Sequence, residues 1–136
     1  MSARGSSRST DCTPAEARVR RDQAQAFIDV AEMVLSEPAT QTEAHVAAAL
    51  AVLAAIAATD AICGLTLGHY SRGQDHTQAV ALLETVDLAD HTLPTKLRRV
   101  LASKDTVHYS PRLVSTSDAR GLVRQARALV KAAERL

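Results

Sequence analysis

The chain has 136 residues, which is enough for one domain and too few for two of ordinary size. Its 16 basic and 15 acidic residues leave a net charge of +1, which excludes a protein that coats nucleic acid through a large positive excess. Abundant alanine and leucine, five glycines, four prolines and 2% aromatic residues are typical of a helical rather than a strand-rich protein. The two cysteines, Cys12 and Cys63, make no disulfide framework and suit a reducing cytoplasm, where we expect the protein to act.

The N-terminal segment is rich in Ser and Arg and shows no hydrophobic period. We therefore expect a disordered tail over residues 1–12, without a signal peptide, and a single domain over residues 13–136. Thr13, Pro14 and Glu16 then form a Thr-x-x-Glu capping box with proline in the first helical position, which predicts a helix that ends near Ser36, ahead of Pro38. Its predicted inner face consists of Val19, Phe27, Val30, Ala31 and Val34.

The most apolar stretch of the chain is Val46–Ala58, with thirteen apolar residues in a row and no polar face. A helix that is apolar all round must be surrounded by lipid or by other helices. The run is shorter than the ~18 residues that a membrane span needs. We therefore predict no membrane segment, and a central bundle helix over Glu43–Leu67 that begins with a Thr40-x-x-Glu43 capping box and ends at Gly68.

Three shorter helices are expected to cover this central one. A polar loop over residues 69–76 precedes a helix capped by Asp75, and a second polar turn over residues 87–92 precedes a helix that begins near Pro94. Ser115 caps the last helix. The predicted inward side chains are Ala79, Leu82, Leu83 and Val86, then Leu93, Leu97, Val100 and Leu101, then Leu122, Val123, Ala126, Leu129, Val130 and Ala133.

The last helix also carries a basic stripe, because its positive residues recur at steps of three and four. Such a stripe is either a solvated face or a nucleic-acid contact surface. Its members are Arg120, Arg124, Arg127, Lys131 and Arg135.

Asp60 is the one charged residue in the second half of the central helix. An ionised carboxylate among alanines must be paired or must face a groove. We expect a histidine or arginine from the turns over residues 69–76 or 104–112 as its partner. Both a buried structural ion pair and a role in orienting a catalytic group are consistent with this position.

The residues around position 108 combine the groups needed for metal-independent RNA cleavage. Lys104 and His108 are four apart and share one face if the fourth helix continues that far. A histidine can exchange a proton with a ribose 2′-hydroxyl or a leaving 5′-oxygen, and a cation can stabilise the charge on the phosphate. The alternative is that His108 and Tyr109 cap the bundle and hydrogen-bond across it.

A similar set of residues lies in the other polar turn, where Arg72 and His76 are four apart. The two turns also share the sequence His-Tyr-Ser, at residues 69–71 and at residues 108–110, and each copy lies beside a basic residue. We therefore take Tyr109, Arg112 and His76 as candidate substrate-binding residues. No Cys-x-x-Cys or His-Glu-x-x-His spacing and no glycine-rich phosphate loop occurs, so we expect no metal and no cofactor.

The order of these parts resembles the HEPN family of prokaryotic helical bundles over about residues 14–135. The resemblance rests on a long Ala-rich second helix ending in AIAATDAIC, a turn SRGQDH, a short helix, a Leu-x3-Leu-x6-His-Tyr segment and a final DARGLVRQARALV helix. It implies an all-α, up-and-down bundle of about five helices. It also implies a homodimer, and either a metal-independent ribonuclease or a non-catalytic module paired with a nucleotidyltransferase.

The ribonuclease branch of that family carries an Arg, four to six residues and then a His. Here His108 matches the histidine, while Ser103 occupies the place of the arginine and Lys104 follows it. The resemblance therefore implies His108 as the acid/base, Lys104 or Arg72 as the phosphate cation and Asp60 as the orienting carboxylate. The expected function is an RNA-directed protein of a bacterial toxin–antitoxin, defence or regulatory system. The alternatives are a non-catalytic dimeric interaction module, such as an antitoxin partner, and a small-ligand binder that uses the Asp60 pocket.

Overall fold

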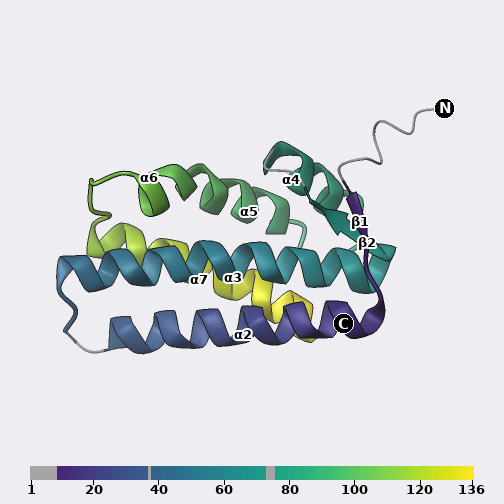
Figure 1. Cartoon of the computed structure of the whole chain (residues 1–136), viewed down its shortest axis with the longest axis horizontal. Helices are drawn as coiled ribbons and strands as arrows, with labels where there is room; N and C mark the ends of the chain where they lie inside the picture. The colour runs from purple at the N-terminus through teal and green to yellow at the C-terminus, as the bar shows by residue number, and fades with distance from the viewer. Residues whose placement is uncertain (1–8, 37, 73–75) are drawn as a thin grey trace.

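The computed structural model describes residues 9–36, 38–72 and 76–136, which form a helical bundle with a small two-stranded sheet at one end (Figure 1). The expected all-α bundle is confirmed. Its two longest helices run antiparallel to each other (Figure 1). The elements are β1 (Ser9–Asp11), α2 (Pro14–Ser36), α3 (Gln41–Leu67), β2 (His69–Ser71), α4 (His76–Glu84), α5 (Leu93–Ala102), α6 (Lys104–Tyr109) and α7 (Thr116–Glu134).

Local capping signals fix where the two longest helices begin and end. In α2 the Glu16 amide donates to Thr13 Oγ1 at 3.1 Å and the Thr13 amide donates to Glu16 Oε1 at 2.9 Å. The Thr40 and Glu43 capping box of α3 is also present, and Gly68 ends that helix with φ 79°, a left-handed conformation that favours glycine. These predicted boundaries are confirmed, whereas the predicted Asp75 cap lies outside the described residues.

The central position predicted for α3 is confirmed. It lies between α2 on one side and α5 and α6 on the other, with α7 behind it (Figure 1). Small side chains let these helices approach closely, and every fully enclosed alanine of α3 contributes to the core. By length and composition α3 could cross a membrane, but 67% of its most hydrophobic 18-residue window is buried inside the protein. The burial favours a core helix over a membrane span.

The predicted inner face of α2 is confirmed at Ala31, which is buried, and at Phe27 and Val34, which pack against the core, but it is wrong at Val19 and Val30. Val19 and Val30 are 55% and 44% exposed, and the side chains that face the core are Ala17, Ala24, Ile28, Ala31 and Leu35. Both sets keep a helical period, so periodicity alone does not choose between them. The small side chains of Ala17 and Ala24 let α2 approach α3 closely, and Val19 and Val30 lie on the outer face.

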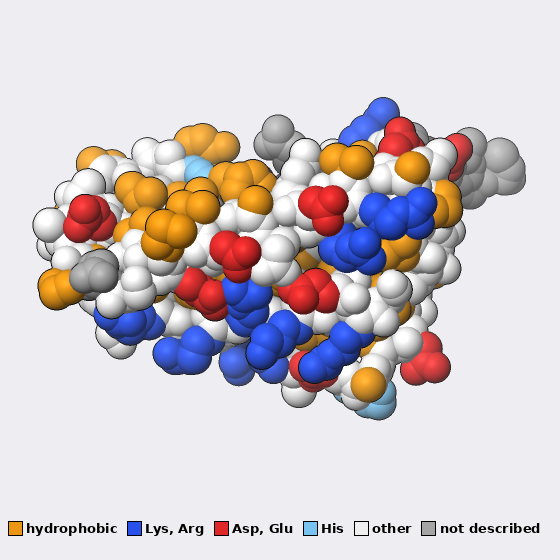
Figure 2. Space-filling model, turned by 90° about the horizontal axis from the view of Figure 1, so that it is seen from below, with side chains coloured by type: hydrophobic (Ala, Val, Ile, Leu, Met, Phe, Trp, Pro, Cys, Tyr) orange, Lys and Arg blue, Asp and Glu red, His pale blue; other side chains and the backbone are white. Residues whose placement is uncertain are grey.

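The cover over α3 is also incomplete. Val46 and Leu53, seven residues apart on one face of α3, are 48% and 38% exposed. Met33 on the neighbouring helix α2 is 65% exposed. Figure 2 shows hydrophobic side chains gathered on the face of the molecule that is seen from below.

The predicted disorder of residues 9–12 is wrong. Residues Ser9–Asp11 pair antiparallel with His69–Ser71, so the predicted polar loop also begins with a strand. The Cys12 amide donates to the Gly68 carbonyl at 2.8 Å, and the Cys12 side chain is 6% exposed. Short polar strands separated by about sixty residues carry no periodic signal, which is why the sequence pattern missed them. The remainder of the expected tail, residues 1–8, lies outside the described part of the chain.

Candidate functional site

A cavity of about 220 Å³ lies where α3, β2, α4 and the junction of α5 and α6 meet. Four predicted site residues line it: Asp60 from α3, Arg72 after β2, His76 at the start of α4 and Lys104 at the start of α6. The other lining residues are Ile56, Thr59, Tyr70, Ser71, Ala79, Leu97 and Leu101. The segments over residues 69–76 and 104–112, both singled out in the sequence, therefore line the same cavity beside α3. Each contributes one cation to it, Arg72 and Lys104.

Asp60 is paired with an arginine that sequence reasoning missed. Arg20 of α2 donates to Asp60 Oδ2 through Nε at 3.2 Å and through Nη2 at 2.8 Å. The expected partner from the polar turns is therefore wrong. In the antiparallel pair of α2 and α3, Arg20 comes level with Asp60, but nothing in the sequence distinguishes Arg20 from Arg18 or Arg21.

The surroundings of Asp60 change its acidity. Burial raises the pKa of this carboxyl group from 3.8 to about 6, and the hydrogen bonds and charge of Arg20 oppose that rise. The side chain is 13% exposed, so the cavity reaches part of it. Near neutral pH the cavity wall therefore combines a paired carboxylate with the two cations Arg72 and Lys104.

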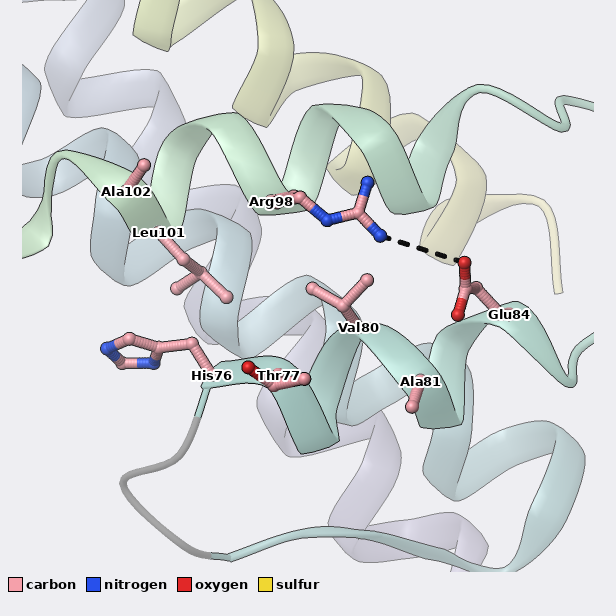
Figure 3. A pocket seen from close by; sticks show the side chains of 8 residues that line it. All are labelled: His76, Thr77, Val80, Ala81, Glu84, Arg98, Leu101 and Ala102. Carbon is pink, nitrogen blue, oxygen red and sulfur yellow. Dashed lines mark ion pairs between the residues drawn. The ribbon is translucent and has the colours of Figure 1, made fainter.

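His76 belongs to two cavities at once. A second cavity of about 280 Å³ lies between α4 and α5, with Val80 and Leu101 on its walls. Figure 3 shows the imidazole of His76 at one end of this cavity, away from the ion pair at the other end, in which Arg98 Nη2 lies 3.7 Å from Glu84 Oε2. His76 thus forms a shared wall between an apolar cavity and the charged cavity around Asp60.

Three predicted site residues lie outside the charged cavity. Burial lowers the pKa of the His108 imidazole, and the nearby charge of Lys104 lowers it further. Its Nε2 is buried and has no hydrogen-bond partner among the described residues. Tyr109 is 75% exposed, and Arg112 lines a separate groove beside α7. Lys104 is therefore the link between His108 and the cavity that holds Asp60.

His45 positions the α6 segment and was not singled out from the sequence. The Val114 amide donates to His45 Nδ1 at 3.1 Å. Because Nδ1 accepts that hydrogen bond, Nε2 carries the hydrogen and donates to the Val107 carbonyl at 2.7 Å. One side chain of α3 thereby fixes both ends of the segment that contains His108. A polar residue at the start of an otherwise apolar helix is the signal that could have identified it.

The donor set of the cavity suits an anionic ligand. Within residues 9–36, 38–72 and 76–136, no group of three His, Cys, Asp or Glu side chains is arranged to hold a metal ion. Arg72 and Lys104 can bind two oxygens of one phosphate, and the imidazole of His76 can transfer a proton beside them.

Comparison of the chain with protein-family models, curated proteins and solved structures gives no match. The HEPN assignment therefore rests on the resemblance of the sequence alone.

Proposed function

We propose that this chain is a HEPN-like, RNA-directed protein of a cytoplasmic toxin–antitoxin, defence or regulatory system, and that it cleaves RNA without a metal ion. The observation that carries the proposal is the cavity into which two separate turns bring Arg72, His76 and Lys104 beside Asp60. These are the groups that phosphodiester cleavage needs: two cations for the phosphate and a proton carrier for the oxygens.

In the proposed reaction the ribose 2′-oxygen attacks phosphorus, and the bond between phosphorus and the 5′-oxygen breaks. His76 takes the proton of the 2′-hydroxyl and delivers it to the departing 5′-oxygen, which leaves a cyclic phosphate and a free 5′-hydroxyl. Arg72 and Lys104 bind the non-bridging oxygens, where negative charge accumulates in the transition state. Asp60, held by Arg20, is the carboxylate that orients the catalytic groups from the wall of the cavity.

This assignment moves the acid/base from His108 to His76. The histidine at position 108 is the one that the resemblance implies, but it does not line the cavity, and its buried Nε2 has no partner in the described ranges. His76 lines the cavity together with both cations.

The test is cleavage of a labelled single-stranded RNA with EDTA present. Removal of a general acid/base lowers the rate by roughly 10²- to 10⁴-fold, so we expect a loss of this size for His76→Gln and a comparable one for Lys104→Gln. His91→Gln is the matched control, because His91 is an exposed histidine outside the charged cavity. Loss of activity in His108→Gln alone would assign the chemistry to position 108 and refute the proposal that the cavity is the active site. Equal activity in all variants and wild type would refute a ribonuclease.

The exposed apolar side chains favour a second candidate function, a non-catalytic dimeric interaction module. Val30 and Met33 on α2 and Val46 and Leu53 on α3 are all more than a third exposed, on helices that pack side by side. A second copy of the chain would remove these side chains from water. In the heteromeric form of this proposal, a nucleotidyltransferase or an antitoxin covers the same side chains in place of the second copy.

The test is the molar mass in solution, measured by light scattering after gel filtration. We expect a dimer for the wild type and a monomer for the double variant Met33→Glu with Leu53→Glu. Val19→Glu is the matched control, since Val19 is also an exposed apolar residue of α2 but lies about 21 Å along the axis from Met33. A wild-type monomer would refute the homodimer.

A further inference from the structure

A groove of about 700 Å³ lies on the other side of α5 and α6, where these helices meet the first turns of α7. Three arginines line it: Arg99 of α5, Arg112 of the loop after α6, and Arg124 of α7. Four residues with side-chain hydroxyl groups also line it: Ser103, Thr106, Ser115 and Ser117. Asp118 is the single acidic residue among its lining residues in the described chain.

These three arginines are exposed, and they differ from the ion-paired arginines of the protein. Arg20, Arg98 and Arg127 each form an ion pair with a carboxylate. In the part of the chain that the structure describes, no carboxylate lies within ion-pair distance of Arg99, Arg112 or Arg124. Three like charges around one groove repel one another, and a bound anion relieves that repulsion.

Gly121 and Gln125 of α7 also line the groove. Gly121 lies inside α7, where glycine weakens a helix. A Cβ atom there would meet only Arg124 Nη2, at 3.9 Å, so the packing of the protein does not require glycine. Gln125 Oε1, one turn further on, is buried and has no hydrogen-bond partner within the described residues. The groove therefore has room for a ligand beside Gly121.

The positive charge continues out of the groove along α7. Arg124 also borders a neighbouring hollow of about 220 Å³ that contains Arg120, and Lys131 and Arg135 are exposed further along the helix. Figure 2 shows Lys and Arg side chains in a row along one edge of the molecule. From Arg124 to Arg135 the row extends about 16 Å. A row of this length suits an extended polyanion rather than a single phosphate.

We propose that this groove binds the phosphate backbone of a single-stranded RNA, with Arg99, Arg112 and Arg124 on the phosphates. The inference rests on the proposed action on RNA and adds a binding surface distinct from the cavity. It also identifies the part of the basic stripe that contacts the strand, because Arg127 is tied to Asp29 and Glu32.

The experiment measures the affinity of the full chain for a fluorescent single-stranded RNA of twelve nucleotides at several salt concentrations. Each phosphate contact contributes about 0.7 to the slope of log K against log salt. Arg99→Gln, Arg112→Gln and Arg124→Gln should therefore each lower the slope by about 0.7 and the affinity roughly fivefold at 0.1 M salt. Arg98→Gln is the matched control, because Arg98 precedes Arg99 but pairs with Glu84 outside the groove.

A second variant blocks the groove without removing an arginine. Gly121→Glu places a carboxylate beside Arg124 and should weaken RNA binding, whereas Gly121→Gln, of the same size, should weaken it less. Circular dichroism of each variant checks that the helices persist.

The outcomes separate the groove from the cavity. RNA binding that is weakened by Lys104→Gln but unchanged in the groove variants would overturn the groove and leave the proposed function standing. Binding that depends on the groove arginines, without cleavage, would support the groove and refute the ribonuclease. Binding of inorganic tripolyphosphate as tight as that of RNA would overturn the assignment to a nucleic acid, and an absence of RNA binding would overturn both proposals.

Discussion

The burial of the Asp60 carboxyl group should make the stability of this protein fall as the pH rises. Its side chain and that of Arg20 lie between α2 and α3, and Asp60 is 13% exposed. Burial raises the pKa of Asp60 to about 6, and Arg20 offsets only part of that rise. We therefore expect Asp60→Asn, which keeps the shape and an oxygen acceptor, to remove a cost that the wild type bears at neutral pH.

The sign and size follow from proton linkage. The folded chain binds the Asp60 proton more tightly than the unfolded chain, whose carboxyl has a pKa near 3.8. This favourable contribution is complete below about pH 4 and is lost as the pH rises through 6. The difference between the two pKa values corresponds to about 3 kcal/mol over the whole range, of which about 1.4 kcal/mol falls between pH 5 and pH 8.

The assay is urea unfolding followed by circular dichroism, for wild type and Asp60→Asn between pH 5 and pH 8. The free energy of unfolding of the wild type should fall relative to that of the variant by about 1.4 kcal/mol, or about 5 °C in melting temperature. Comparing the two proteins cancels the titration of all other groups. Parallel pH profiles, or a wild type that gains on the variant as the pH rises, would show that Arg20 fully compensates the burial of Asp60.

Two further predictions concern the packing around α3. Gly64→Ala should cost about 1–3 kcal/mol in urea unfolding, because its Cβ would lie 2.6 Å from Cys12 Sγ; Gly121→Ala, which meets no such contact, should stabilise by up to about 1 kcal/mol. An unchanged midpoint for Gly64→Ala would contradict the close approach. His45→Ala should cost about 1–3 kcal/mol and speed hydrogen exchange of the Val114 amide, which loses its acceptor. Unchanged exchange there would show that another group holds the segment.

The parts of the fold that the sequence predicted are those governed by local signals. The capping box at Thr40 and Glu43, the glycine at position 68 and the uninterrupted apolar run act within a few residues of the chain. Such signals place the ends of helices and identify which helix must be central. They do not say which face of a neighbour it meets, and Val19 and Val30 of α2 were therefore assigned to the core, whereas Ala17 and Ala24 were missed.

The site was predicted in part for the same reason. Both polar turns could be identified by their residue types, and the cavity does bring Arg72, His76 and Lys104 beside Asp60. The partner of Asp60 could not be identified, because pairing between helices depends on their relative shift, which composition and period leave open. The groove of Arg99, Arg112 and Arg124 could not be predicted from the sequence for a similar reason, because its three arginines come from three separate segments.

One turn of helix separates the cavity from the groove. Lys104 lines the cavity, whereas Ser103 and Thr106, on either side of it in sequence, line the groove. On the two proposals taken together, a strand bound in the groove crosses the start of α6 to bring a phosphodiester to Lys104. The position of α6 then controls both surfaces, and His45 fixes that position through Val107 and Val114. His45→Ala should accordingly lower both RNA cleavage and RNA binding, because Arg112 lies between Val107 and Val114 and Lys104 begins the same helix as Val107, and an unchanged affinity for RNA would show that the groove does not depend on this segment.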